Sequence, residues 1–128
     1  MPLKRQNLAV LFLLMVLLAG CGAGGSPSQA VEDYLGAIVD GDWTQAVNLS
    51  CASWEEGARA EANSFESIDA WLEGVACATQ YEETDTAAVS CQGVIRATYG
   101  TEERQLTLEG RVYQVVRDGG EWRVCGYQ

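Results

Sequence analysis

The sequence predicts an α+β domain in which helices come first and a four-stranded antiparallel sheet follows. Over residues 27–51 apolar residues recur with helical spacing. After Gly74 the chain becomes rich in β-branched and aromatic residues, partly alternating with polar ones. Near the end, Asp118-Gly119-Gly120 is typical of a β-hairpin turn.

The first helix has a clear start and a clear apolar face. Ser26 is followed by Pro27 and Gln29, which is the pattern of an N-cap, a first-turn proline and a capping-box partner. One face of the helix then carries apolar residues at i, i+3, i+4 and i+7, namely Val31, Tyr34, Leu35 and Ile38. Gly41 is expected to end this helix.

Two further helical stretches are predicted before the sheet. Asp42 has the capping pattern of a short second helix, which is expected to bury Trp43, Ala46, Val47 and Leu49. Ser53 repeats the pattern for a third, less regular stretch. That stretch is expected to break near Asn63 and to resume through Ile68, Trp71 and Leu72 as far as Gly74.

Four strands are predicted over residues 75–82, 87–99, 105–117 and 121–127. The third is expected to bury one face that holds Leu106, Leu108, Val112 and Val116. If residues 118–120 form the last loop, Val116 lies opposite Trp122, whose face also holds Val124. The two apolar faces then coincide, which favours the hairpin.

Residues 1–20 have the pattern of an export signal. Lys4 and Arg5 precede a nearly continuous apolar run over residues 8–18, which is short for a membrane span. The run ends in Leu18, Ala19, Gly20 and Cys21, which resembles a bacterial lipobox. The resemblance implies that diacylglycerol is attached to the Cys21 thiol and that the chain is cut before this residue. The alternatives are an uncleaved membrane anchor, or a secretory signal with Cys21 as a disulfide partner.

Cleavage before Cys21 leaves a short tether over residues 21–28 and one domain over residues 29–128. The mature chain keeps six arginines against 18 acidic residues, for a formal net charge of −12. Such a charge repels the phosphates of nucleic acid, so nucleic acid is not an expected partner. The predicted location is the bacterial cell envelope, outside the cytoplasm, with a lipid anchor in the membrane.

Four cysteines remain in the predicted domain, and an even number in an exported chain favours two disulfides. Three pairings are possible. Strand counting places Cys77 opposite Cys91, which leaves Cys51 to pair with Cys125. Strand alternation puts Cys125 off the Trp122 face, which speaks against that second bridge. No metal site is expected, because the chain has no histidine and no CxxC spacing.

Residues 30–43, AVEDYLGAIVDGDW, resemble the opening of NTF2-like domains, in particular small bacterial lipoproteins of the DUF4878 type. The last predicted strand, GEWRVC over residues 120–125, resembles their final strand. This resemblance implies a cone of curved antiparallel sheet around helices, an NTF2-like or cystatin-like shape that often leaves an apolar pocket at its mouth. The role of such lipoproteins is unknown.

No catalytic set is expected, although catalytic NTF2-like members use buried Asp and Tyr or an Asp-Arg-Asp set. The chain has no histidine to act as a general base, and no cofactor motif is present. The favoured hypothesis is a protein-interaction or envelope-accessory module. The alternative is a pocket for a small apolar or amphipathic ligand, with Tyr34, Trp54, Trp71 and Tyr99 as its possible lining.

Overall fold

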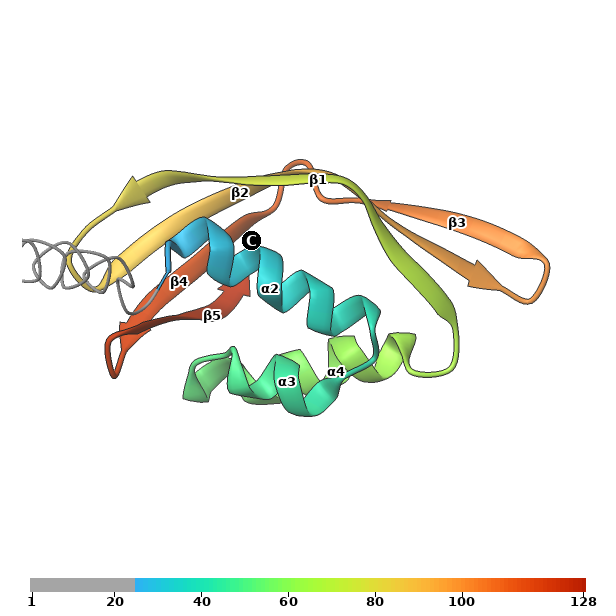
Figure 1. Ribbon diagram of the computed structural model, residues 1–128, viewed down its shortest axis with the longest axis horizontal. Coiled ribbons are helices and arrows are strands. Elements are labelled where there is room, and N and C mark those ends of the chain that lie inside the picture. Colours follow the sequence, from blue (N-terminus) through green and yellow to red (C-terminus); the bar gives the residue numbers. More distant parts are fainter. Residues whose placement is uncertain (1–24) are drawn as a thin grey trace, which may run out of the picture.

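The structure, a computed structural model, describes residues 25–128 (Figure 1). Residues 1–24, with the predicted signal and lipobox, lie outside the described part of the chain. The helices come first: α2 (Pro27–Val39), α3 (Trp43–Asn48), the 3-10 helix η2 (Ala52–Trp54) and α4 (Glu55–Phe65). The strands follow: β1 (Asp69–Glu82), β2 (Thr86–Tyr99), β3 (Glu102–Thr107), β4 (Val112–Asp118) and β5 (Glu121–Tyr127).

The first two helices begin where the capping patterns place them. The Ser26 side chain accepts a hydrogen bond from the Gln29 N–H at 3.1 Å, and Pro27 occupies the first turn of α2. Pro27 and Ser28, which the prediction assigned to the tether, therefore belong to helix α2. Asp42 caps α3 in the same way, through the Gln45 N–H.

The burial predicted for α3 is only partly correct. Ala46 is fully buried, but Trp43 is 39% exposed, and Val47 and Leu49 are half-buried. Trp43 lies at the first position of its short helix, where the Arg59 guanidinium covers the ring at 4.2 Å. This cation–π contact shields the ring without taking it into the core.

The prediction for residues 53–74 is wrong at both ends. Ser53 does not cap α4, which has no side-chain cap at its start. Helix α4 ends at Phe65, and β1 begins at Asp69, so Trp71 and Leu72 lie in a strand. Because β1 pairs with β2 from Asp69 onward, cross-strand pairing decides the conformation of a segment whose apolar spacing also fits a helix.

The sheet has five antiparallel strands, one more than predicted, in the order β1-β2-β4-β5, with β3 also paired to β2. Strand β4 pairs with the first half of β2 and β3 with the second half, so the two follow one another along one edge of β2. The predicted single strand over residues 105–117 is divided by a turn at Gly110, which has a φ of 87°. Glycine readily adopts this left-handed backbone conformation.

The buried face of β4 is offset by one residue from the prediction. Tyr113 and Val115 are buried, while Val112 and Val116 are half-buried, and Leu106 of β3 is 37% exposed. In β5, Trp122 and Val124 are buried as expected. Val115 pairs with Val124 and Arg117 with Trp122, because the hairpin loop is only Gly119-Gly120 and not the predicted three residues. A two-residue loop with positive φ at both positions suits the twist of a hairpin.

A bulge between Glu73 and Ala76 bends the sheet. Opposite it lies Gly93, where a Cβ atom would be 2.6 Å from the carbonyl oxygen of Gly74, so only glycine fits. Beyond the bend, β3 and its partner segment of β2 form an arm that extends past the helices (Figure 1). The arm lies at the opposite end of the long axis from the start of α2.

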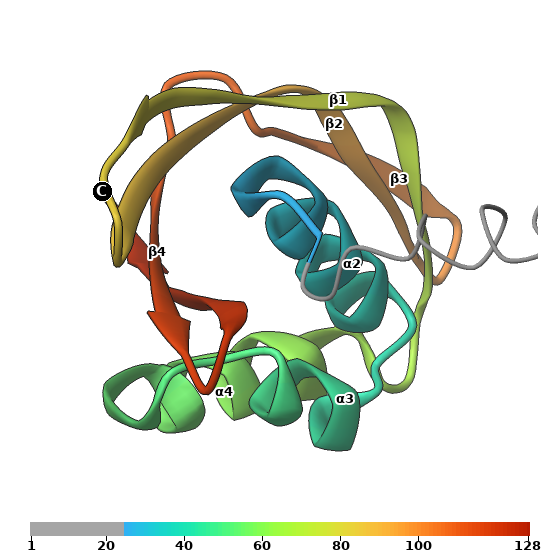
Figure 2. The same ribbon diagram turned by 60° about the vertical axis from the view of Figure 1, so that its left-hand side comes forward.

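The core lies between the concave face of the sheet and the helices. The sheet curls around α2, and α3 and α4 close the remaining side (Figure 2). The largest fully buried side chains are Tyr34, Tyr113, Leu35, Ile38 and Leu108, with four valines around them. This arrangement confirms the predicted α+β class and the curved sheet wrapped around N-terminal helices.

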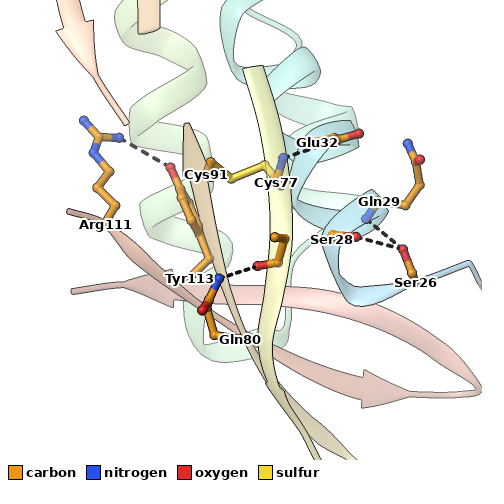
Figure 3. The surroundings of a disulfide bond; sticks show 10 residues. Ser26, Ser28, Gln29, Glu32, Cys77, Gln80, Cys91, Arg111 and Tyr113 are labelled. Atoms are coloured by element: carbon orange, nitrogen blue, oxygen red, sulfur yellow. Dashed lines mark hydrogen bonds between the residues drawn. A yellow bond between two sulfur atoms is a disulfide. The ribbon is translucent and has the colours of Figure 1, made fainter. Parts of the chain in front are cut away.

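Both expected disulfides are present. Cys77 and Cys91 are cross-strand partners with Cα atoms 4.0 Å apart (Figure 3). Cys51 bonds Cys125 across 74 residues of sequence. Cys125 does point away from the core, as strand alternation requires, yet the bridge forms because residues 49–51 run along the outer edge of β5. There the Cys51 N–H donates to the Val124 carbonyl at 2.9 Å.

Candidate functional site

The four residues expected to line a pocket do not come together. Tyr34 of α2 and Trp54 of η2 meet in the interior, where Trp54 Nε1 donates to the Tyr34 hydroxyl at 2.9 Å. Trp71 lies on β1 and Tyr99 at the end of β2, and their side chains are 39% and 40% exposed. None of the four lines any of the three clefts described below.

Tyr34 and Trp54 instead belong to a polar and aromatic group that we call the tyrosine cluster: Tyr34, Trp54, Glu61, Arg111, Tyr113 and Tyr127. Tyr127 packs edge-on against Trp54, with ring centroids 6.1 Å apart, and against Tyr113 at 5.2 Å. The cluster gathers side chains from α2, η2, α4, β4, β5 and the residue before β4.

Arg111 covers the side of the cluster where the chain enters β4. Its guanidinium lies 4.7 Å from the centre of the Tyr127 ring, and its Nη1 donates to the Tyr113 hydroxyl at 3.4 Å. Figure 3 shows this last contact near the Cys77–Cys91 disulfide. Arg111 and Tyr127 are half-buried, whereas Tyr34 and Tyr113 are fully buried. Solvent therefore contacts Arg111 and Tyr127 at the edge of the cluster but does not reach the Tyr34 and Tyr113 side chains.

Glu61 is the group in this cluster whose charge is least well compensated. Burial raises the pKa of its carboxyl, while the positive charge of Arg111 and the hydroxyls of Tyr127 and Tyr34 oppose that rise. Within residues 25–128, Glu61 Oε1 is a buried oxygen without a hydrogen-bond partner of ordinary geometry. Burial also raises the pKa of Tyr34 and Tyr113, so both hydroxyls are neutral at physiological pH.

We predict that Glu61→Gln stabilises the protein at pH 7. The pKa of Glu61 is higher in the folded than in the unfolded chain, so its contribution to stability is full below its ordinary value of 4.5 and is lost as the pH rises through the folded value. The glutamine side chain keeps the shape of Glu61 but has no negative charge for burial to disfavour, so we expect a gain of about 1 kcal/mol at pH 7. Urea unfolding of both forms between pH 4 and 8 measures it.

The difference between the two unfolding curves should shrink toward acid pH, because the wild-type carboxyl then carries a proton. Glu109→Gln, at an exposed turn position, is the matched control and should leave the curve unchanged. A Glu61→Gln protein that is less stable than wild type at pH 7 would show that the carboxylate is well compensated in the cluster.

Three clefts lie on the surface of the described residues, away from the tyrosine cluster. The largest, about 460 Å³, lies between the α3–η2 segment and the β4–β5 turn and is lined by polar residues such as Asn48, Glu55 and Arg123. A second, of about 220 Å³, lies at the start of α2 beside Trp122. A third, of about 210 Å³, lies around Cys77 and Cys91. The largest cleft therefore does not coincide with the buried titratable groups.

Two kinds of site can be checked directly in residues 25–128. No three His, Cys, Asp or Glu side chains in this range are grouped closely enough to hold a metal ion. No helix within it has both the length and the apolar character needed to cross a bilayer.

Sequence reasoning included Tyr34 and Trp54 among the possible pocket residues but missed Glu61, Arg111 and Tyr127. The available signal for Tyr127 was its pairing position, because it lies opposite Tyr113 across β4 and β5. Glu61 gave no signal, since it sits among alanines and polar residues in a helix of low hydrophobicity. Its burial depends on the packing of α4 against the rest of the chain.

No protein-family model matches the chain, and no curated protein sequence matches it. Solved structures do resemble it. Rv3472, a protein of unknown function from Mycobacterium tuberculosis, matches 99% of this chain and 73% of its own, with a TM-score of 0.55 and 12% identity. A SEC-C motif containing protein from Rhodopseudomonas palustris matches 80% and 77%, with a TM-score of 0.54 and 14% identity.

Aln2 from a Streptomyces species gives a TM-score of 0.52 at 17% identity, over 81% of this chain and 90% of its own. Identities this low show a shared fold and carry no activity from one protein to another. Together the comparisons and the curled sheet establish the fold as an NTF2-like α+β cone.

Proposed function

We propose that this protein is a lipid-anchored envelope lipoprotein that acts outside the cytoplasm as an accessory module, by binding another protein. The observation that carries the proposal is the filled cone. Tyr34 and Tyr113 are fully buried, and Trp54 and Tyr127 pack against one another, at the place where an apolar ligand would have to lie. A module without an internal ligand site works through its surface.

The surface offers suitable features. Strand β1 has an open edge, and the arm exposes Tyr99 and Leu106 on its concave side and Trp71 on the other. Exposed edge strands and exposed aromatic residues are common elements of protein-binding surfaces. The two disulfides indicate an oxidising compartment, which agrees with an extracytoplasmic place of work.

The second candidate function is the binding of a small amphipathic molecule at the tyrosine cluster. The unpartnered Glu61 oxygen and the half-buried Arg111 and Tyr127 favour it, because a ligand hydroxyl or amine could complete the hydrogen bonding there. It ranks second because none of the three clefts opens onto the cluster. Catalysis ranks below both.

Zero-length crosslinking with a carbodiimide in native membranes tests the first proposal. The only lysine of the chain is Lys4, which the proposed cleavage removes, so carboxylates of the mature protein have no side-chain amine of a second copy to couple with. A covalent adduct whose added mass differs from that of a second copy therefore reports a different protein. We expect one discrete adduct together with a bare mass for the protein in native mass spectrometry. A co-purifying small molecule that leaves on denaturation, with no adduct, would favour the second candidate instead.

The lipid anchor has its own test. We predict that Cys21→Ser leaves the full-length chain uncleaved and unlabelled by radioactive palmitate, because the thiol is the site of acylation. Cys77→Ser is the matched control, since it removes a cysteine of the folded domain and should be labelled as well as wild type. Palmitate labelling of Cys21→Ser at the wild-type level would refute the lipobox interpretation.

A further inference from the structure

The two edge strands of the sheet, β5 and β1, differ in whether another segment of the chain hydrogen-bonds to their outer side. At the β5 edge, Val124 exchanges hydrogen bonds with Leu49 and Cys51, and the Cys51–Cys125 bridge holds that segment in place. At the other edge, the 14-residue strand β1 pairs with no strand of residues 25–128 except β2. One edge is thus covered by the protein itself, and β1 is left with one side unpaired.

Two bulges interrupt β1, between Glu73 and Ala76 and between Thr79 and Tyr81, but its open edge lacks the side chains that usually prevent pairing. Residues 74–81, GVACATQY, contain no charged residue and no proline, although edge strands of monomeric proteins commonly carry both. Ala78, Thr79 and Gln80 are exposed. The second half of β1 therefore presents a free strand without the side chains that normally prevent another strand from adding to it.

The backbone direction at this edge follows from one contact. The Cys77 N–H donates to Glu32 Oε1 at 3.0 Å, so it points away from β2 and toward α2 (Figure 3). In an antiparallel pair the outward-pointing residues alternate, so Thr79 directs its N–H and carbonyl to the same side. Glu32 caps one of the outward groups, and the groups of Thr79 remain available to an added strand.

Acidic residues stand at the end of this free edge. Glu82 ends β1, and Glu83 and Asp85 lie in the turn into β2. Within the described part of the chain none of the three is in an ion pair. At the other end of the uncharged run, Glu73 is already paired with Arg96. The charge that remains to be matched is therefore negative and lies beside the turn.

We propose that the β1 edge from Cys77 to Glu82 binds an extended segment of a partner protein, an uncharged β-forming stretch with lysine or arginine where it meets the acidic turn. The added strand would hydrogen-bond to Thr79, and its basic residues would face Glu82, Glu83 and Asp85. This inference rests on the proposed function and names its partner chemistry. A second copy fits less well, because the chain carries a net charge of −10 and would bring the same acidic turn to the pairing.

The test uses full-length protein with both disulfides and two synthetic peptides as probes. Both peptides alternate threonine and valine; one carries two lysines at each end and the other two glutamates. Fluorescence anisotropy should show binding of the lysine peptide, and binding of the glutamate peptide at least about tenfold weaker. The double variant Glu82→Lys/Glu83→Lys should reverse this preference, and both substituted positions are exposed.

Thr79→Pro is the variant that addresses the backbone. The Thr79 N–H points away from β2, so proline removes no bond within the sheet but blocks an added strand. We expect the lysine peptide to bind at least about tenfold more weakly to Thr79→Pro and unchanged to Thr79→Val, which keeps the N–H. Thermal unfolding of both variants verifies that they are folded.

The outcomes separate this inference from the proposed function. Equal binding of the lysine peptide to Thr79→Pro and to wild type would overturn the edge site. A carbodiimide adduct in native membranes that persists in Thr79→Pro would leave the accessory function standing and refute this edge. A dimer in analytical ultracentrifugation that Thr79→Pro dissociates would identify a second copy as the occupant and overturn the basic partner. The inference is supported if Thr79→Pro loses both the adduct and the peptide complex while Thr79→Val keeps both.

Discussion

Replacing Cys51 by alanine should lower the free energy of unfolding by about 4 kcal/mol. The Cys51–Cys125 bridge closes a loop of 74 residues, and a loop of that length restricts the unfolded chain strongly. The Cys77–Cys91 bridge spans 14 residues, so Cys77→Ala should lower it by a smaller amount, about 3 kcal/mol. Guanidinium unfolding of the oxidised variants measures both losses.

The partner variant and the double variant complete this experiment. Cys125→Ala should lower the free energy of unfolding as much as Cys51→Ala, and the double variant should lower it little further, because either change breaks the same bond. Losses that add in the double variant would show that each cysteine contributes through its own packing. The residual difference from Cys51→Ala reports the contacts of Cys125 alone.

Tyr34→Ala should lower the free energy of unfolding by a similar amount, about 4 kcal/mol. Its ring is fully buried at the centre of the concave side, and truncating a buried aromatic side chain leaves a cavity that the core fills only in part. The change also removes the acceptor of the Trp54 indole N–H. Urea unfolding followed by tryptophan fluorescence measures the loss.

Tyr34→Phe is the matched control, because it keeps the ring and removes only the hydroxyl. We expect it to lower the free energy of unfolding by about 1 kcal/mol, the range of one buried hydrogen bond. If alanine and phenylalanine were equally destabilising, the hydroxyl contact with Trp54 would matter more than the filling of the cone. A destabilisation of Tyr34→Ala below that of an ordinary surface substitution would show that the cone is not filled around residue 34.

The helix starts and the order of elements were predictable from sequence because local chemistry decides them. Ser26 and Asp42 cap their helices with their own side chains, and Trp122 and Val124 alternate in a strand with an unambiguous pattern. The Cys77–Cys91 disulfide was predictable because the two cysteines lie opposite one another in a hairpin, and the Cys51–Cys125 pairing then followed by elimination.

The errors lie where long-range pairing decides between locally equivalent choices. In β4, valines at both Val115 and Val116 make either face apolar, and only the pairing with β2 selects Val115 for the core. Residues 69–74 fit a helix by spacing but extend β1, because β2 provides partners for them. The loop at Gly119-Gly120 has two residues where three were predicted, and this length sets the register of the last hairpin.

The tyrosine cluster was the least predictable part of the molecule. Glu61 and Arg111 lie far apart in sequence, and both are charged residue types that are rarely buried. They meet because the packing of α4 places Glu61 near Arg111 and Tyr127. By contrast, Trp71 and Tyr99 are aromatic residues of a type that lines pockets. Both lie on the far side of the bend at Gly93, which separates the arm from the helices.

The segment of residues 49–51 along β5 determines how the protein should be handled during purification. Reduction of the Cys51–Cys125 bond would release this segment from the Val124 backbone and uncover the second edge of the sheet. A sheet with two open edges can add molecules at both ends and so grow into fibrils, whereas a sheet with one open edge stops at a pair. Storage with a thiol reductant should therefore turn a clear solution turbid over time.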